Sequence, residues 1–332
     1  MHSNTKVPVP IADVRTLARL HLGEDVREAQ ELSDGMYNAA YRVRLSDGTT
    51  AVLKVAPPEG VPGLAYERSL MRAEVAFFEL ARGRAPVPEV LAADFTRTAL
   101  DRDVLFLSHL EGAPLRKIGK RLSESQRYRV RAELGEAAAR LHQVQGTSFG
   151  YERSGDPSLK GATWPAAFAS MYEAALADAV RFNVHLGVPL AAIREALDRH
   201  LPALAVVERP ALVHFDLWDG NVFAGLHEGE AHLTGIIDGE RMFWGDPLAD
   251  LVSTSLFRNP AADIAFNDGY ARAGGTRWSF DEEERMRLAL YSMYICTLML
   301  VEAVPRGYRG IGATLTNQYV RGRLRAALRS MR

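Results

Sequence analysis

Residues 212–222 read LVHFDLWDGNV, and this stretch decides the fold. The apolar run at 211–214 predicts a strand, and the loop after it carries Asp216 and, five residues later, Asn221. A second apolar run at 233–237 predicts another strand, which ends in Asp238. The two strands are expected to be neighbours, and strand ends that carry carboxylate and amide oxygens offer the hard ligands that Mg²⁺ prefers. The pattern indicates a Mg²⁺ site, with a further carboxylate left to orient an attacking hydroxyl.

A simpler interpretation is that each acid is a turn residue after a strand, and for one aspartate alone that explanation is sufficient. All three side chains in this order and at this spacing favour the metal site. His214 is expected to hydrogen-bond to the backbone and hold the loop, rather than to transfer protons. Asp246, which precedes Pro247, is expected to be a helix N-cap.

Three motifs in this region carry a family resemblance. The spacing His214-x-Asp216-x-x-x-x-Asn221 resembles the catalytic loop shared by protein kinases and aminoglycoside phosphotransferases. Residues 238–240, DGE, are similar to the metal-binding triplet that follows that loop, and residues 245–251, GDPLADL, resemble the GDPxxDL segment of the small-molecule branch. The chain thus resembles the aminoglycoside phosphotransferase family of small-molecule kinases, and more weakly so over nearly its whole length.

The resemblance implies an α+β, protein-kinase-like bilobal fold with an antiparallel-sheet N-lobe and a mostly helical C-lobe. It implies that Asp216 is the catalytic base or hydroxyl orienter and that Asn221 and Asp238 hold Mg²⁺. ATP or GTP would be the co-substrate, and its γ-phosphate would move to a hydroxyl of a small molecule. Such a reaction depends mainly on positioning and on neutralising charge.

Lys54 lies inside the apolar strand predicted at 50–56, where a charge is costly unless it is paired. Glu74 lies twenty residues later on a predicted helix. The two resemble the lysine and helix glutamate that grip the α- and β-phosphates in kinase-fold enzymes. Lys54 on the solvent face of its strand is the alternative, and Glu67 and Glu79 on the same predicted helix compete with Glu74 for the role.

Residues 32–41 occupy the place of the phosphate-covering loop and contain one glycine, Gly35. They resemble the sparse SxGxxN form of the family, which implies that Ser33, Gly35 and Asn38 contact phosphate. A glycine lets the backbone approach phosphate closely. The alternative is an ordinary hairpin turn.

By fold analogy, the adenine is expected at the linker between the lobes, against backbone groups from Ser108 to Leu110. Val52 and an apolar residue near Val222 or Ile237 would close that site.

The chain departs from the protein-kinase pattern at two positions. Trp218 stands where protein kinases have a lysine, which argues against that function, and Gly239 stands where an aromatic residue is usual. The stretch from 238 to 246 is too short for a peptide-binding activation segment. The loop DLWxGN is similar to that of fructosamine kinases. Glu240 and Arg241 either line the acceptor pocket or form an ion pair at a turn.

The acceptor pocket is expected among the helices predicted at 164–182 and 280–301. An acidic lining would suit a cationic acceptor such as an aminoglycoside, an amino sugar or choline. The aromatic candidates are nevertheless expected in the core and the acidic ones on solvated helix faces, so none is assigned as a binding residue. The candidates are Trp164, Tyr172, Glu173, Asp178, Tyr291, Tyr294 and Glu302.

The remaining helices and strands are predicted from periodicity, and the chain is expected to form two lobes. Residues 1–109 would form an N-terminal lobe that binds the nucleotide, and residues 110–332 would form a C-terminal lobe that carries catalysis and binds the acceptor. Turn residues at 108–114 mark the linker. An Asp-Gly pair at 47–48 predicts a hairpin. Further strands are expected at 40–45, 89–95 and 104–108. Further helices are expected at 11–22, 64–82, 123–144, 191–201 and 314–331.

The composition of the 332 residues is that of an ordinary globular protein, with 47% hydrophobic and 24% charged residues. A net charge of −1 gives no general attraction to nucleic acid or to an anionic membrane. The single cysteine, Cys296, is expected in the core, and a cytoplasmic location is expected because no signal peptide or spanning segment is evident. The sequence leaves open which molecule is the acceptor, whether the co-substrate is ATP or GTP, and what the oligomeric state is. A non-catalytic nucleotide-binding protein and a fructosamine- or choline-type metabolic kinase are the alternatives.

Overall fold

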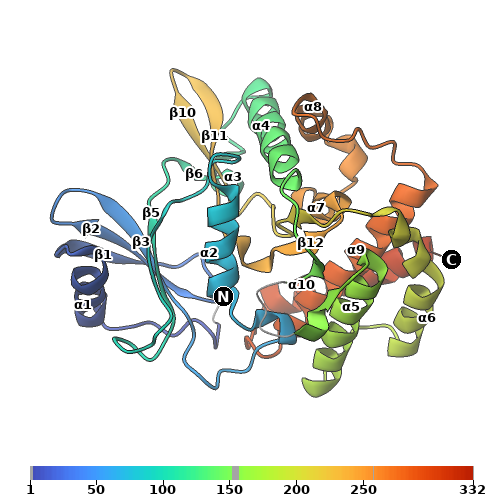
Figure 1. The fold of residues 1–332 in the computed structure, drawn as a ribbon, viewed down its shortest axis with the longest axis horizontal. Coiled ribbons are helices and arrows are strands. Elements are labelled where there is room, and N and C mark those ends of the chain that lie inside the picture. Colours follow the sequence, from blue (N-terminus) through green and yellow to red (C-terminus); the bar gives the residue numbers. More distant parts are fainter. Residues whose placement is uncertain (1–2, 152–156, 257, 332) are drawn as a thin grey trace.

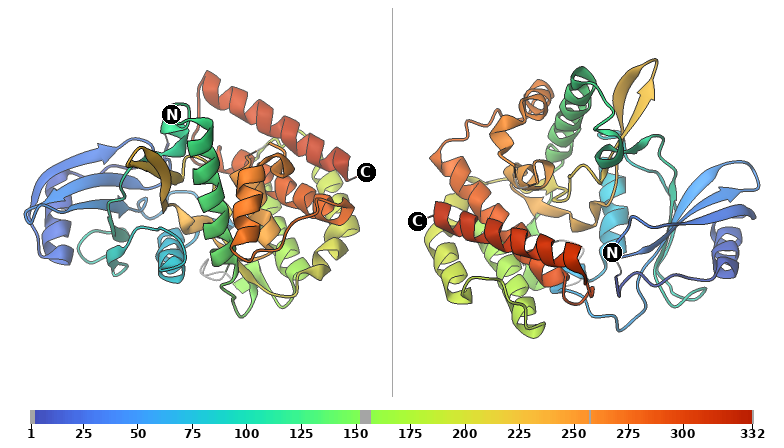
Figure 2. Two further views of the ribbon diagram at one scale, coloured as in Figure 1. Left: turned by 90° about the horizontal axis from the view of Figure 1, so that it is seen from above. Right: turned by 180° about the vertical axis from the view of Figure 1, so that it is seen from behind.

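The computed structural model describes residues 3–151, 157–256 and 258–331, and it divides into a sheet-rich part and a helical part (Figure 1). The sheet-rich part comes first in the chain, and the long helices gather at the other end of the molecule (Figure 2). The predicted order of an antiparallel sheet followed by mostly helical structure is therefore present.

One antiparallel sheet with the strand order β1-β2-β3-β5-β4 forms the first part. Its strands are β1 (Val26–Leu32), β2 (Ala39–Leu45), β3 (Thr50–Val55), β4 (Val90–Asp94) and β5 (Val104–Ser108). The predicted hairpin joins β2 to β3, and the Asp47 carboxylate accepts the Thr49 amide hydrogen at 2.8 Å there. β3 is central in the sheet, so Lys54 is held between two neighbouring strands.

The segment predicted as one helix at 64–82 is two elements. A short 3₁₀ turn, η1 (Ala65–Glu67), precedes α2 (Leu70–Ala81). Ser69 adopts a left-handed backbone conformation with φ of 59°, which separates the two elements. α2 buries Glu74, Phe77 and Phe78 and lies between the sheet and the helical part (Figure 1).

The second part is built mainly from helices. Its helices within the described residues are α3 (Leu115–Ile118), α4 (Glu124–His142), α5 (Trp164–Arg181), α6 (Leu190–His200), α7 (Asp250–Thr254), α8 (Ile264–Arg272), α9 (Glu282–Glu302) and α10 (Ile311–Ser330). Helix α1 (Ile11–Leu22) belongs to the first part, as α2 does. The capping box predicted from Ser123 and Gln126 begins α4. Helix α8 was not predicted from the sequence, and it packs closely on α4 where Gly269 faces the Ala132 carbonyl.

Short strands interrupt these helices: β6 (Ala113–Pro114), β7 (Phe149–Gly150), β8 (Lys160–Gly161), β9 (Ala211–Val213), β10 (Val222–His227), β11 (Glu230–Ile236) and β12 (Phe243–Gly245). β9 and β11 correspond to the two strands predicted on either side of the catalytic-loop motif. They do not pair with each other, because β11 pairs with β10 and β9 pairs with β12. The loop between β9 and β10 carries Asp216 and Asn221.

An aromatic core lies directly beneath this loop. The Phe215 ring is buried 5.0 Å from the Phe243 ring and 5.8 Å from the Tyr294 ring. Trp164 and Tyr291 extend the cluster, with a hydrogen bond of 2.8 Å from the indole N–H to the phenol oxygen. Large buried rings dominate core energetics. Cys296 is also fully buried here, as predicted.

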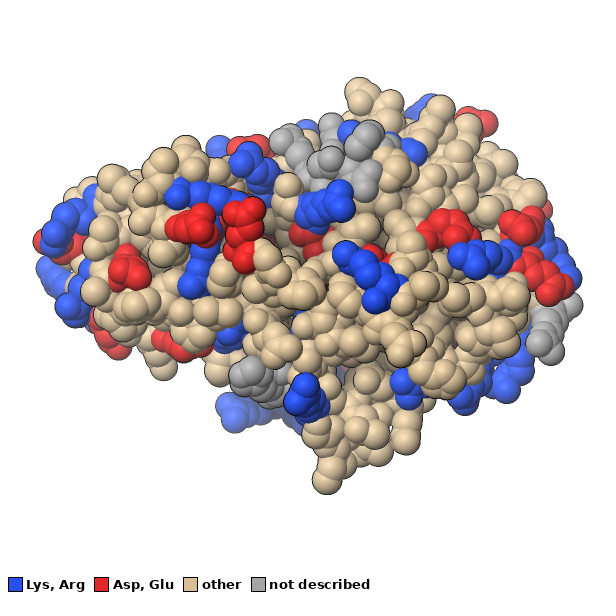
Figure 3. Space-filling model, turned by 90° about the horizontal axis from the view of Figure 1, so that it is seen from below, with Lys and Arg blue, Asp and Glu red and all other residues tan. Residues whose placement is uncertain are grey.

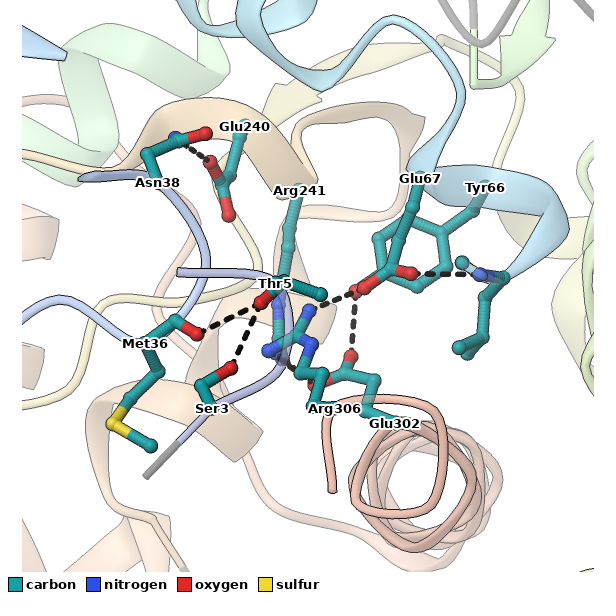
Figure 4. A network of polar contacts seen from close by, with 12 residues as sticks. Ser3, Thr5, Met36, Asn38, Tyr66, Glu67, Glu240, Arg241, Glu302 and Arg306 are labelled. Atoms are coloured by element: carbon teal, nitrogen blue, oxygen red, sulfur yellow. Dashed lines mark hydrogen bonds and ion pairs between the residues drawn. The ribbon is translucent and has the colours of Figure 1, made fainter. Parts of the chain in front are cut away.

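Residues 3–9, called the N-terminal segment below, connect the two parts. The Asn4 amide donates to the Arg306 carbonyl at 2.8 Å, and the Thr5 hydroxyl donates to the Met36 carbonyl at 3.1 Å (Figure 4). The Val9 amide donates to the Tyr41 hydroxyl at 2.8 Å. The N-terminal segment thus joins the loop after β1 to the turn after α9.

The surface carries both signs of charge. On the face drawn in Figure 3, basic and acidic side chains are interspersed over both parts, as the net charge of −1 suggests. Among the helices of the described ranges, none is long and apolar enough to cross a bilayer.

Candidate active site

Lys54 is bound by two carboxylates. Its Nζ lies 2.5 Å from Glu74 Oε1 on α2 and 2.5 Å from Asp238 Oδ1 after β11. Burial lowers the pKa of Lys54, but the charges of Asp238 and Glu74 outweigh it and raise the pKa above its usual value. Burial raises the pKa of Glu74, against the effect of Lys54. The predicted pair of Lys54 is therefore formed with Glu74. Of the two competing acids, Glu79 is exposed and Glu67 pairs with Arg306.

Asp216 and Asn221 meet within their loop. The Asn221 Nδ2 donates to the Asp216 carbonyl and to Asp216 Oδ2, both at 3.0 Å. The turn requires a left-handed conformation at Phe215, with φ of 62°, which the buried ring holds in place. Burial raises the pKa of Asp216, while the nearby charge of Arg241 opposes the rise.

His214 holds the loop, as predicted. The Asp216 amide donates to His214 Nδ1 at 3.1 Å, so Nε2 carries the proton and donates to the Ile237 carbonyl at 3.0 Å. Burial lowers the pKa of His214, which favours this neutral form. The imidazole therefore links the Asp216 loop to the strand that ends at Asp238.

Asp250, to which the sequence analysis gave no role, fixes the loop from below. Its Oδ1 accepts the Phe215 amide hydrogen at 2.6 Å, and its Oδ2 accepts the His214 amide hydrogen at 3.1 Å. Oδ2 also lies 2.9 Å from His142 Nε2. The Ser253 hydroxyl accepts the Leu217 amide hydrogen at 3.0 Å. The GDPxxDL resemblance is the sequence signal that marks Asp250.

Asp246 caps the 3₁₀ turn η5 (Pro247–Ala249), since its Oδ1 accepts the Leu248 amide hydrogen at 3.0 Å, as predicted. Its Oδ2 also accepts from the Arg287 guanidinium at 2.6 Å and from the Tyr291 hydroxyl at 2.8 Å. The cap is therefore tied to α9 and to the aromatic core.

The unusual Gly239 is explained by Phe77 of α2. A Cβ atom at position 239 would lie only 2.2 Å from Phe77 Cδ1. The Phe77 ring packs edge-on against the His214 ring, with 4.8 Å between their centroids. The aromatic ring expected from the metal-binding triplet is thus supplied by α2 instead, one turn from Glu74.

A cavity of about 360 Å³ opens over these side chains, between the loop after β1 and helices α9 and α10. Of the predicted site residues, its lining includes Gly35, Asn38, Lys54, Asp216, Asn221 and Asp238. Trp218 also lines it. Ser33, Ser108 and Leu110 do not, and Glu74 lies behind Lys54. The Ser108 amide and hydroxyl are engaged by Glu89 at 2.8 Å each.

A charged network lies at the far side of this cavity; the sequence indicated Arg241 and Glu302 as candidate lining residues but not their pairing (Figure 4). Glu302 Oε2 lies 2.8 Å from Arg241 and 3.1 Å from Arg306, and its Oε1 accepts from the Tyr66 hydroxyl at 2.5 Å. Arg306 also pairs with Glu67. Burial opposes the charge on Glu302, but the two guanidinium groups lower its pKa. We call these five residues the Arg–Glu network.

Glu240 lies on the other side of the cavity. Asn38 Nδ2 donates to its Oε2 at 3.4 Å. Burial together with Glu74 and Asp238 raises the pKa of Glu240 to about 8. Asn38 therefore joins the loop after β1 to the segment that follows Asp238.

The remaining acceptor candidates do not converge on the cavity. Trp164, Tyr172, Tyr291 and Tyr294 are fully buried core residues. Glu173 pairs with Arg194 at the surface, and Asp178 accepts from the Ala65 amide at 2.6 Å. Of that group only Glu302 lines the cavity.

The oxygen donors fit a magnesium–nucleotide complex. Asn221 uses its amide nitrogen for Asp216, and within the described part of the chain Asn221 Oδ1 and Asp238 Oδ2 make no hydrogen bond. Mg²⁺ in kinase-type sites takes one or two protein ligands, and phosphate and water oxygens complete its shell. The described residues contain no cluster of three His, Cys, Asp or Glu side chains that could hold a metal alone. The donor set therefore suits a metal that arrives with phosphate.

This fold and this arrangement of side chains are those of a kinase-type phosphotransferase. A model of the phosphotransferase enzyme family matches residues 28–289, which is most of the chain, and the chain belongs to that family. A search of curated proteins gave no significant match.

Several solved structures share the fold at low sequence identity. A candidate fructosamine-3-kinase from Thermobifida fusca is 23% identical with a TM-score of 0.67, over 95% of this chain and 98% of that one. A thermostable aminoglycoside phosphotransferase APH(4)-Ia, in complex with AMP-PNP and hygromycin B, is 20% identical with a TM-score of 0.63, over 96% and 98%. The macrolide 2′-phosphotransferase MphH from Brachybacterium faecium is 17% identical with a TM-score of 0.57, over 92% and 97%. The predicted kinase-like bilobal fold is confirmed.

Proposed function

We propose that the protein transfers the γ-phosphate of ATP or GTP to a hydroxyl group of a small molecule. One observation carries the proposal: Lys54, Asp216, Asn221 and Asp238 line the same cavity. A cation for phosphate, two oxygen donors for a metal and a carboxylate for the acceptor are the parts that phosphoryl transfer requires. The nucleotide would lie between residues 1–109 and residues 110–332, with its adenine near Ser108 and Leu110.

Each side chain has a defined task in this proposal. Asp216 Oδ2 is held by Asn221 at 3.0 Å, which leaves Oδ1 to accept the hydrogen of the acceptor hydroxyl and orient its oxygen. Lys54, fixed by Glu74, would bind phosphate oxygens, and Ser33, Gly35 and Asn38 would cover them. Asn221 and Asp238 would hold Mg²⁺, which neutralises charge on the transferring phosphoryl group.

The direct test measures ADP release from Mg-ATP with a panel of hydroxyl acceptors. Asp216→Asn should lower turnover roughly 10²–10⁴-fold and leave nucleotide affinity nearly unchanged. Asp219→Asn is the matched control, since Asp219 is in the same loop but pairs with Arg131 at 3.4 Å. Normal turnover in Asp216→Asn would remove that residue from its role. Nucleotide binding without transfer to any acceptor would favour a non-catalytic nucleotide-binding protein.

A further inference from the structure

Helix α10 lines one wall of the cavity, which we call the acceptor side. It contributes no charged side chain to that wall. The side chains that α10 contributes are Ala313, Thr316, Asn317 and Val320. Ile295 and Met299 of α9 lie beside them. An apolar surface with a few uncharged polar groups is suited to a ligand of the same character.

The charges on this side of the cavity belong to the Arg–Glu network, and they are balanced. Both oxygens of Glu302 are engaged, Oε2 by Arg241 at 2.8 Å and by Arg306 at 3.1 Å, and Oε1 by Tyr66 at 2.5 Å. Glu67 is committed to Arg306. Two guanidinium groups thus face two carboxylates. An ammonium group that approached Glu302 would have to compete with two guanidinium groups and a phenol that already occupy both carboxylate oxygens, and displacing one partner of a buried ion pair is strongly unfavourable.

The other acids of the cavity lie on the side of Lys54 and the loop after β1. Asp238 binds Lys54 at 2.5 Å, and Glu240 accepts from Asn38 at 3.4 Å. Asp34 pairs with Lys117 at the rim. Among the described lining residues, the carboxylates of Asp216 and Glu240 form no ion pair, and Glu240 accepts from Asn38, which leaves Asp216 as the carboxylate that faces the acceptor.

We propose that the acceptor is an uncharged hydroxyl compound with an apolar face, and that polyamines such as aminoglycosides are excluded. The apolar face would pack on Ile295, Met299 and Val320, and other hydroxyls would meet Thr316 and Asn317. This inference rests on the proposed function, because only that function makes the bound molecule a phosphate acceptor.

The first test is calorimetry on the full chain loaded with Mg²⁺ and AMP-PNP, at low salt. The probes are an alkyl glycoside, the same glycoside with an amine in place of one hydroxyl, and an aminoglycoside. The alkyl glycoside should bind at least about tenfold more tightly than its amino analogue, and the aminoglycoside should not bind saturably. Stoichiometric aminoglycoside binding that is tighter than glycoside binding would overturn the inference.

A charge change at the network gives the second test. Arg241→Met leaves Glu302 with one guanidinium partner, so saturable aminoglycoside binding, which is not expected in the wild type, should appear. Arg241→Met with Glu302→Gln restores the balance and should abolish the gain. Arg194→Gln makes the same change in net charge at an exposed pair with Glu173 and should have no effect. If Arg241→Met folds and gains no aminoglycoside binding, the charge argument is refuted. If that variant does not fold, the calorimetric comparison of the three probes on the wild-type protein decides the inference.

The two proposals fail separately, because binding needs no turnover. Phosphate transfer that is fastest to an aminoglycoside would contradict the charge inference and support the kinase function. Absence of transfer to every probe, with the expected order of affinities, would contradict the kinase function alone.

Discussion

Asn221 and Asp216 are joined twice, because one amide nitrogen donates to both the backbone carbonyl and the carboxylate of Asp216, each at 3.0 Å. This arrangement turns the amide oxygen of Asn221 away from Asp216 and leaves it for a metal. One side chain therefore fixes the proposed hydroxyl-orienting carboxylate and keeps its own oxygen available for the proposed metal.

Replacing Asn221 with Ala should raise the Mg²⁺ concentration required for half-maximal activity roughly 10–100-fold, because a ligand and a support for Asp216 are lost together. Initial rates across a Mg²⁺ titration measure the effect. Asn267→Ala on α8, whose amide donates to the Pro260 carbonyl, is the control. An unchanged Mg²⁺ requirement in Asn221→Ala would exclude Asn221 as a metal ligand.

Replacing Lys54 with Met should weaken nucleotide binding and also destabilise the fold, since Glu74 is fully buried and would lose its cation. Removing one partner of a buried pair costs about 3–5 kcal/mol. Fluorescence titration with nucleotide and urea denaturation measure the two effects. Lys54→Met with Glu74→Gln should recover much of the stability and none of the nucleotide affinity. Recovery of both would show that Lys54 has only a structural role.

Replacing Gly239 with Ala should destabilise the protein by about 1–3 kcal/mol, as overpacking does in other cores. The new Cβ would lie 2.2 Å from Phe77 Cδ1 and would push on the helix that carries Glu74. Activity should fall as well. Shortening the ring with Phe77→Leu in the same variant should restore part of both. Denaturation midpoints and turnover of the single and double variants test this, and a Gly239→Ala protein of normal stability would contradict the steric argument.

Alkaline pH should destabilise the protein through its buried core. Burial raises the pKa of Cys296 to about 12, from 9.0 for an exposed thiol, and it raises the pKa of Tyr172 and Tyr291 in the same direction. The unfolded chain releases these protons at a lower pH than the folded chain does. Their contribution to stability is therefore complete below pH 9 and is lost as the pH rises toward 12.

Urea midpoints measured at pH 8 and at pH 10.5 check this expectation, together with tyrosinate absorbance. Cys296→Val should make the midpoint less sensitive to pH. Alkylation of Cys296 should be slow in the native protein at pH 8 and fast in urea. Rapid native alkylation would show that the thiol is accessible.

Local patterns were sufficient for much of the fold. The apolar periodicity placed α1 and β5 at their observed bounds, and the spacing from Asp216 to Asn221 placed both side chains in one loop. These features depend on neighbours within a few residues. The break at Ser69 was missed, because nothing in the periodicity of residues 64–82 marks a left-handed residue.

Long-range packing set the features that the sequence did not reveal. The Arg–Glu network joins Glu67 to Arg306, which is 239 positions away, and Arg241 to Glu302, which is 61 positions away. Phe77 fills the space over Gly239 because α2 crosses that turn. Such pairs depend on how α2 and α9 sit against the sheet and the Asp216 loop, and no local pattern specifies that placement.

The N-terminal segment has a practical consequence for work on this enzyme. Asn4 is bonded to the turn after α9 and Thr5 to the loop after β1, and both of these elements border the cavity. An affinity tag or fusion partner placed ahead of Ser3 would approach the rim of the candidate active site. Recombinant protein for kinetics and crystallisation should therefore carry its tag at the opposite terminus, or have the amino-terminal tag cleaved.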